Sequence, residues 1–446
     1  MISQTEIALT RECVQFALSE GADAVRITLT KSTEDLIATL DGEVDRVSRC
    51  ADRSMSIAIF ADGRFGSFSI NKLDRESLRD FIRRSIGTVR MLAPDDKRVL
   101  PSPARYCREA VSGREMEIYD EAYAGIDAGA RKEKALAASA FSKGSGIEGV
   151  RLISEEGEYS DSEYDVYLID SQGLECRHSE TSFDYGVEVT LQDEQGNKYS
   201  DYWWTASPRL ADFDPSGCAR TAIGRAAAQI GARPAESGSY KMVVSANVAS
   251  RLVTPLLSAL NGYSIQQGNS FLVDSLGKSV FSEGLSIVDE PWRKGEAGSK
   301  LFDSEGVRTS PAPVISEGCV KQYFINTYMA GKLGKEPTVE DAIRPRVCGW
   351  PRPGLDTQAL MEICGEGILV TDFNGGNCNM TTGDFSYGIS GMLFKDGRSV
   401  RPVNGMLVTG NFLTLWKNLI AAGEDYRPCA TKLIPSLAFD KVDFSG

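Results

Sequence analysis

Two Asp-Gly turns near the start of the chain constrain its fold more than any other feature. One apolar run covers 36–40 and leads through Asp41-Gly42 to Val44 and Val47, and a second covers 55–60 and leads through Asp62-Gly63 to Phe65 and Phe68. Glycine accepts the positive φ that tight hairpin turns demand. The two runs therefore predict two β-hairpins, and hence an antiparallel sheet.

Two segments whose apolar residues have helical spacing flank these hairpins, one on each side in the sequence. Apolar residues recur every three or four positions over 5–20 and again over 78–89, which is typical of amphipathic helices. The order helix, strand, hairpins, helix predicts an α+β fold in which helices pack on one face of an antiparallel sheet.

A linker divides the chain. The Ala-rich segment 116–142 predicts a helix, and strands near 148–154, 163–170 and 183–192 and a helix over 216–230 follow it. The segment GARPAESGSY at 231–240 has the composition of a linker. We therefore expect an N-terminal α+β domain over 1–232 and a C-terminal domain over 233–446. Beyond a helix near 248–260, the C-terminal domain is dense in glycine and short apolar runs, which predicts a strand-rich, barrel-like structure.

Charge and hydropathy exclude several classes of protein. No segment reaches the roughly 20 apolar residues of a membrane helix, and Glu6, Arg11, Glu12 and Glu20 interrupt the apolar core that a signal peptide would need. We expect a cytoplasmic protein without a membrane partner. The net charge of −13 repels phosphate backbones, so direct binding of nucleic acid is not expected.

A single histidine restricts the chemistry. His178 stands in an alternating segment and is predicted to be an exposed or hydrogen-bonded strand residue. A zinc helix with two histidines one turn apart cannot be built, and a Ser-His-Asp or Cys-His site could use only His178. The ten cysteines form no CxxC pair and are interpreted as reduced thiols.

The segment 374–391, NGGNCNMTTGDFSYGISG, is the strongest candidate for a site. Its glycines suit positive-φ positions between short strands, but they do not explain the polar cluster TTGDFS. Its carboxylates and amides do not have the spacing of an EF-hand, and its glycines do not form a P-loop. A nucleophile at Thr382 or Ser386 with a base such as Lys321 is one further possibility.

Residues 376–425, beginning GNCNMTTGDFSYGISGMLF, resemble the PmbA/TldE branch of the TldD/PmbA family, also named modulators of DNA gyrase. The segments 61–78, 271–291 and 300–334 resemble other blocks of the same family. The resemblance implies a two-domain fold, with an N-terminal antiparallel sheet and a barrel-like C-terminal half, and it implies dimers.

The resemblance also implies a division of labour. TldD-type members bind a metal through an HExxxH helix and a later cysteine, and they cleave peptides. PmbA/TldE-type members lack that motif and pair with a TldD-type subunit. Here the counterpart of the metal helix, 246–261, has no histidine or acidic residue, and Cys429 is interpreted as structural. No metal, other cofactor or catalytic residue is expected in this chain, and zinc is expected in a TldD-type partner.

The expected function is therefore that of a PmbA/TldE-like subunit of a TldD/TldE-type metalloprotease, contributing substrate binding and cavity formation. Unfolded or modified peptides are the expected substrates. Two alternatives remain open, a metal-independent hydrolase acting alone and a non-catalytic homodimeric binding or regulatory protein. The expected substrate-binding residues are Asn379, Thr381, Thr382, Gly383, Asp384, Phe385 and Asn411.

Overall fold

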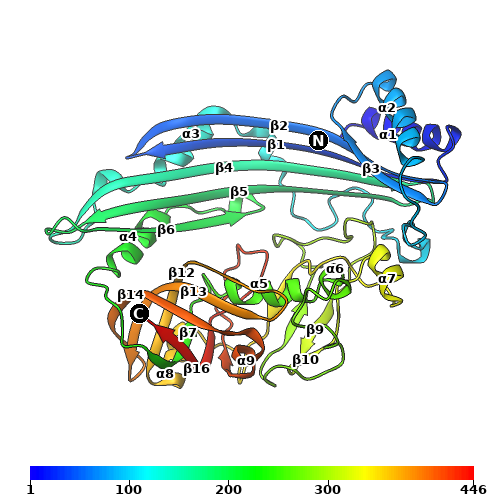
Figure 1. Cartoon of the computed structure of the whole chain (residues 1–446). Helices are drawn as coiled ribbons and strands as arrows, with labels where there is room; N and C mark the ends of the chain where they lie inside the picture. Colours follow the sequence, from blue (N-terminus) through cyan, green and yellow to red (C-terminus); the bar gives the residue numbers. More distant parts are fainter.

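Six long antiparallel strands form the N-terminal part of the protein (Figure 1). The computed structural model describes residues 1–446. The strands lie in the order β3-β2-β1-β4-β5-β6. Their bounds are β1 Ala24–Leu40, β2 Glu43–Ala61, β3 Arg64–Ile70, β4 Arg151–Asp170, β5 Glu175–Gln192 and β6 Lys198–Ser207.

Both predicted hairpins are confirmed. Asp41 and Gly42 join β1 to β2 with φ of 52° and 83°, and Asp62 and Gly63 join β2 to β3 with φ of 51° and 68°. Both turns place an aspartate and a glycine in the left-handed region, which few other residues tolerate. The local sequence therefore sets the register of the first three strands.

Four helices cover one face of this sheet, because alternate residues of its strands are apolar on that side. Helices α1 (Gln4–Ser19) and α2 (Arg75–Val89) bury one end of the face, and α3 (Ala128–Ala137) and α4 (Cys218–Ala227) bury the other. Ile27 and Ile37 of β1 point to the same side, and they belong to the first and the second of these apolar clusters.

The prediction of one helix over 116–142 is wrong. The segment contains the 3-10 turn Glu121–Gly125, the helix α3 and the 3-10 turn Phe141–Lys143. The side chains of Asp120 and Asp127 accept hydrogen bonds from the N–H groups of Ala122 and Ala130, so each aspartate starts a new short element. The separate strands predicted near 148–154 and 163–170 are one continuous strand, β4.

The C-terminal part contains a closed five-stranded barrel, which confirms the barrel-like prediction. Its strands follow the order β14-β13-β12-β7-β16, and β14 also pairs with β16 to close the ring. A core cluster of 42 buried residues fills the C-terminal part. The strands are β7 Gly238–Val244, β12 Gly367–Cys378, β13 Asp384–Lys395, β14 Arg398–Asn411 and β16 Leu437–Ser445, and β15 Leu419–Ala422 pairs outside the ring with β16.

Smaller elements surround the barrel. A four-stranded sheet has the order β10-β9-β8-β11, with β8 Ile287–Asp289, β9 Ala312–Ser316, β10 Cys319–Val320 and β11 Pro345–Val347. The helices are α5 Ser250–Ala259, α6 Gly262–Gln266, α7 Thr327–Leu333, α8 Thr357–Cys364 and α9 Phe412–Lys417. None of the helices combines the length and the apolar run that crossing a bilayer requires.

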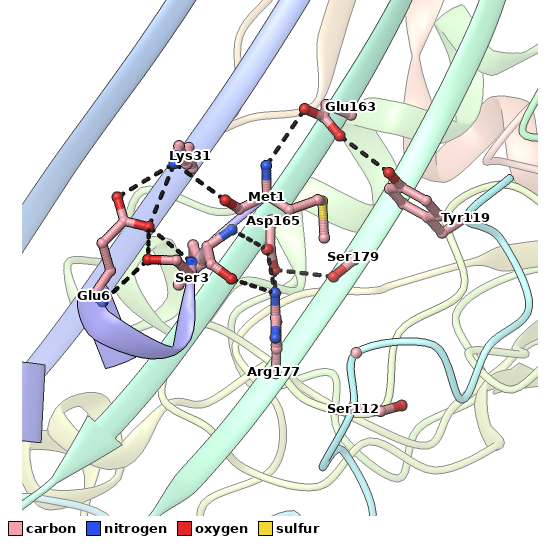
Figure 2. A network of polar contacts seen from close by, with 12 residues as sticks. Met1, Ser3, Glu6, Lys31, Ser112, Tyr119, Glu163, Asp165, Arg177 and Ser179 are labelled. Carbon is pink, nitrogen blue, oxygen red and sulfur yellow. Dashed lines mark hydrogen bonds and ion pairs between the residues drawn. The ribbon is translucent and has the colours of Figure 1, made fainter. Parts of the chain in front are cut away.

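A buried polar network ties the first residues of the chain to the middle of the sheet (Figure 2). The carboxylate of Asp165, which is 1% exposed, accepts from the N–H of Ile2 over 2.7 Å and from the hydroxyl of Ser179 over 2.9 Å. The guanidinium of Arg177 donates to Asp165 over 2.6 Å and to the carbonyl of Ile2 over 3.0 Å. The buried charge of Asp165 is therefore paired and hydrogen-bonded, as a buried carboxylate must be.

Candidate functional site

The predicted segment 374–391 forms the end of one hairpin of the barrel. Strand β12 ends at Cys378, residues 379–383 make the turn, and β13 starts at Asp384. The register shifts between Phe373 and Gly376. A Cβ on Gly376 would lie 2.0 Å from the carbonyl oxygen of Ser386, so this close approach of the two strands requires glycine.

The polar side chains of the turn bond to one another. Asn379 Oδ1 accepts from the N–H of Thr381 over 2.9 Å, and the Thr382 hydroxyl donates to Asp384 over 2.7 Å. Asn411, at the end of β14, donates to the Thr382 carbonyl over 2.8 Å and to Asp384 over 2.9 Å. These hydrogen bonds from Asn411 and Thr382 lower the pKa of Asp384, so the carboxylate form holds the turn together.

Aromatic side chains support the turn from below. The ring of Phe385 is buried, with centroids 4.8 Å from Phe412 and 5.5 Å from Tyr387. Gly383 has φ of +83° and a Cβ there would meet Phe271 at 3.2 Å, so a side chain would strain the backbone and crowd the ring. The seven predicted residues are thus brought together in one place. The Thr382 hydroxyl donates to Asp384 and not to a lysine, and the assignment of these residues to substrate contact stays a prediction.

A large cavity lies elsewhere, between the face of the sheet that carries no helices and the C-terminal part. It has a volume of about 800 Å³. Strands β5 and β6 contribute Glu180, Ser182, Asp184 and Trp204 from above. From the C-terminal part come Asn247, Ser250, Lys300, Arg427, Cys429, Thr431 and Lys432. None of the seven predicted substrate-binding residues lines this cavity.

The upper wall of the cavity is acidic, and its carboxylates Glu180 and Asp184 are half-buried. Burial raises the pKa of Asp184, against a weaker opposing effect of the hydrogen bond from Ser182. Burial acts to raise the pKa of Glu180, but the hydrogen bond and the electrostatic effect of His178, together with the nearby Lys300, outweigh it, so that the net pKa is lowered. His178 itself is 4% exposed, with Nε2 3.1 Å from Glu180. The predicted strand histidine is therefore hydrogen-bonded, and it is buried.

The opposite wall is basic. The guanidinium of Arg427 stacks on Trp203 and Trp204, at 4.3 and 4.2 Å from the ring centroids, and donates to the carbonyl of Trp204. The ammonium of Lys432 donates to Thr254 of α5 over 3.2 Å. Charges of both signs therefore face a single cavity, an arrangement suited to a zwitterionic or polar chain such as a peptide.

These residues do not fit zinc. Cys429 is the one thiol among the cavity residues, and no imidazole joins it. No group of three or more His, Cys, Asp or Glu residues in the protein is positioned to hold a metal ion. Lys432 also places a positive charge next to α5, which disfavours a divalent cation there.

Sequence reasoning missed the cavity because its residues come from seven distant segments. One signal was available: Trp203 and Trp204 are adjacent on a strand, so their rings leave on opposite faces. A pair of this kind places one large ring on each side of the sheet. The four helices cover only one side, so the ring on the other side indicates that another part of the chain packs there.

Comparisons with known proteins agree over the whole chain. Residues 126–230 match the family model of the PmbA/TldA metallopeptidase central domain, and residues 237–446 match that of the C-terminal domain. The chain is 26% identical to the metalloprotease PmbA of Escherichia coli O157:H7 over 467 aligned residues, covering 98% of each protein.

Solved structures give the same result. A candidate modulator of DNA gyrase from Bacteroides thetaiotaomicron VPI-5482 superposes with a TM-score of 0.94 and 35% identity, covering 100% of both chains. TldE from Thermococcus kodakarensis superposes with a TM-score of 0.82 over 98% of this chain and 100% of its own. Its identity is 17%, so this second likeness concerns the fold alone.

Proposed function

Because the chain belongs to the PmbA/TldA metallopeptidase family, we propose that it is a PmbA/TldE-like subunit of a TldD/TldE-type metalloprotease. A TldD-type partner supplies the zinc that activates the attacking water. This chain supplies contacts to the peptide and one wall of the chamber in which cleavage occurs. The complex acts on unfolded or modified peptides in the cytoplasm.

The observation that carries this proposal is the contact between Lys432 and Thr254. It places an ammonium group beside α5, in the cavity that also contains Cys429. The resemblance makes the segment 246–261, which includes α5, the counterpart of the metal helix of TldD-type members. A lysine at this position favours an anion over a metal cation. The cavity is therefore suited to bind part of a substrate, such as a carboxylate or a peptide carbonyl, and not to activate water.

Peptide binding has two candidate elements in this chain. The cavity offers carboxylates on the sheet side and Lys300 and Lys432 on the other, which matches the alternating donors and acceptors of a polypeptide. The turn 379–384 offers exposed Thr381 and Thr382 at the end of the barrel. We propose that the cavity holds the substrate and that the turn contacts it outside the cavity.

The test is a reconstitution with three samples: this chain, a TldD-type homologue, and a mixture of the two. Each sample is incubated with a fluorogenic unfolded peptide, with and without a chelator, and its zinc content is measured. We expect cleavage in the mixture, none by this chain, and zinc only in samples that contain the homologue.

Two results would contradict the proposal in different ways. Turnover by this chain alone in the presence of chelator would indicate a metal-independent hydrolase. Failure of the chain to bind the homologue or to alter its activity would indicate a non-catalytic protein that works without such a partner.

A further inference from the structure

The outer edge of the N-terminal sheet is bare over half of strand β2. All nine residues of 45–53 are exposed, although they lie within a regular strand. Strand β3 pairs with β2 only from Met55 onward, so no strand lies beyond residues 43–54. In the view of Figure 1, β2 is the uppermost strand and the C-terminal part lies below β5 and β6, so the barrel does not cover this edge.

An edge of this length presents a row of unpaired backbone groups. The only strands that pair with β2 are β1 and β3, and the backbone of 43–54 makes no other hydrogen bond within the chain. Edges of this kind are usually protected by charged side chains or by a cover, because they otherwise pair with another strand. The order of the charges on β2 decides whether these side chains protect the edge or allow it to pair with another strand.

We propose that this edge pairs antiparallel with the same edge of a second copy of this chain, about a two-fold axis at Arg49. In a two-fold interface of this type, a residue that lies a given number of positions before Arg49 in one copy faces the residue the same number of positions after Arg49 in the other copy. In this register Arg46 of each copy lies opposite Asp52 of the other, and Val47 lies opposite Ala51.

Charge complementarity selects this register. The Arg46 and Asp52 pair occurs twice across the interface, and Asp45 and Arg53 extend the same pattern at its ends. Opposite charges directly across two strands are stabilising, and like charges there are destabilising. A shift by one residue would set Asp45 against Asp52 or Arg46 against Arg53, so the neighbouring registers are penalised.

Two further features agree with self-pairing. Val47 is 66% exposed, and its contact with Ala51 would remove this apolar side chain from water. The two Arg49 residues meet at the axis, which is unfavourable, but each has a carboxylate of its own chain nearby, because Nη1 of Arg49 lies 3.7 Å from Asp35. Arg46 is only loosely held within its own chain, 3.6 Å from the exposed Glu158.

The experiment uses charge reversals whose effects cancel in a mixture. In Arg46→Asp each copy carries Asp at 46 and 52, so self-pairing sets like charges together twice. The same holds for Asp52→Arg with arginines. A one-to-one mixture of the two variants restores both opposite-charge pairs. Oligomeric state is measured for the full chain alone by sedimentation equilibrium over a range of concentrations.

We expect the wild-type chain to dimerise, each single variant to dimerise at least about tenfold more weakly, and the mixture to recover the wild-type affinity. Arg352→Asp and Glu148→Arg make the same charge changes at exposed positions away from β2, and they should dimerise like the wild type. A monomeric wild type, a dimer insensitive to both β2 variants, or a mixture that fails to recover would each overturn the inference. This inference does not depend on the proposed function.

Discussion

The phenol of Tyr328, on α7, donates a 2.8 Å hydrogen bond to Asp95, in the loop that follows α2. Lys332 of the same helix lies 3.1 Å from this carboxylate, and the guanidinium of Arg98 stacks 3.4 Å above the Tyr328 ring. These contacts join the N-terminal part to the C-terminal part at the end opposite α4. The hydrogen bond from Tyr328 is the largest of the effects that lower the pKa of Asp95 to about 2.

This lowered pKa makes the contact dependent on pH. The carboxylate form is favoured in the folded protein, so the stabilisation is fully present above the ordinary pKa of 3.8 and is lost as the pH falls towards about 2. Asp95→Asn should therefore flatten the decrease of Tm between these two pH values, measured by thermal unfolding. Tyr328→Phe should flatten it in part. Tyr263→Phe removes a phenol that is 55% exposed and should leave the profile unchanged, and equal effects of the two tyrosine variants would refute the assignment.

The buried pair of Asp165 and Arg177 should be costly to break. Arg177→Met leaves a carboxylate that is 1% exposed without its cation, which costs about 3–5 kcal/mol in the free energy of unfolding. The exposed pair of Arg75 and Glu12 has a similar distance, 2.7 Å, but side chains 63% and 46% exposed, so Arg75→Met should cost less than about 1 kcal/mol. Urea unfolding of both variants measures the difference, and comparable losses would show that burial is not the deciding factor.

The turn at Asp384 is expected to affect peptide cleavage by the assembled protease. Asp384→Ala removes the acceptor for Thr382 and Asn411, and the loosened turn should lower kcat/KM by about tenfold. Thr382→Ala should act in the same direction. The matched control is Asp193→Ala, since Asp193 holds another exposed turn through Asn197. If cleavage is unchanged in both turn variants, residues 379–384 do not contact substrate.

The cavity is expected to hold substrate, so reducing its volume should reduce cleavage. Ser250→Trp projects a large ring from the start of α5 into the space between the sheet and the barrel. We expect kcat/KM of the reconstituted protease to fall by about tenfold or more, because the lost binding energy is also lost in the transition state. Thr414→Trp, on the exposed side of α9, adds the same ring outside the cavity. Equal activities of the two variants would mean that the cavity is not used.

A chelator should distinguish this chain from its partner. Only an ion bound to the folded state stabilises it by mass action, and no suitable ligand group is assembled here. The Tm of the purified chain should therefore change by less than about 1 °C when a chelator is added, whereas cleavage by the reconstituted complex should stop. A large decrease of Tm for the chain alone would reveal a metal site formed by its own residues.

Local signals predicted the parts of the fold that depend on neighbouring residues. The Asp-Gly turns at 41–42 and 62–63 require positive φ, and this requirement is visible in the sequence. The helix over 116–142 failed because alanine content records only propensity, while Asp120 and Asp127 compete for the backbone N–H groups. A strand of 20 residues such as β4 also exceeds what a short window of alternation can indicate.

Of the two candidate sites, the turn could be predicted from neighbouring residues and the cavity could not. Six of the seven predicted residues are consecutive or nearly so, and Asn411 joins them because it pairs with Asp384 across β13 and β14. The cavity had no such signature. Glu180, Ser250 and Lys432 are ordinary residues in their own segments, and only the packing of the barrel against the sheet brings them together.

The closure of the barrel has a consequence for the order of assembly. Strand β16 lies between β7 and β14, yet it is the last of the five to leave the ribosome. Until residues 437–445 emerge, a nascent chain holds β7 and β14 with open flanks. This half of the protein can therefore close only after residues 437–445 have been synthesised, and a translation product that stops before them would remain exposed to chaperones and proteases.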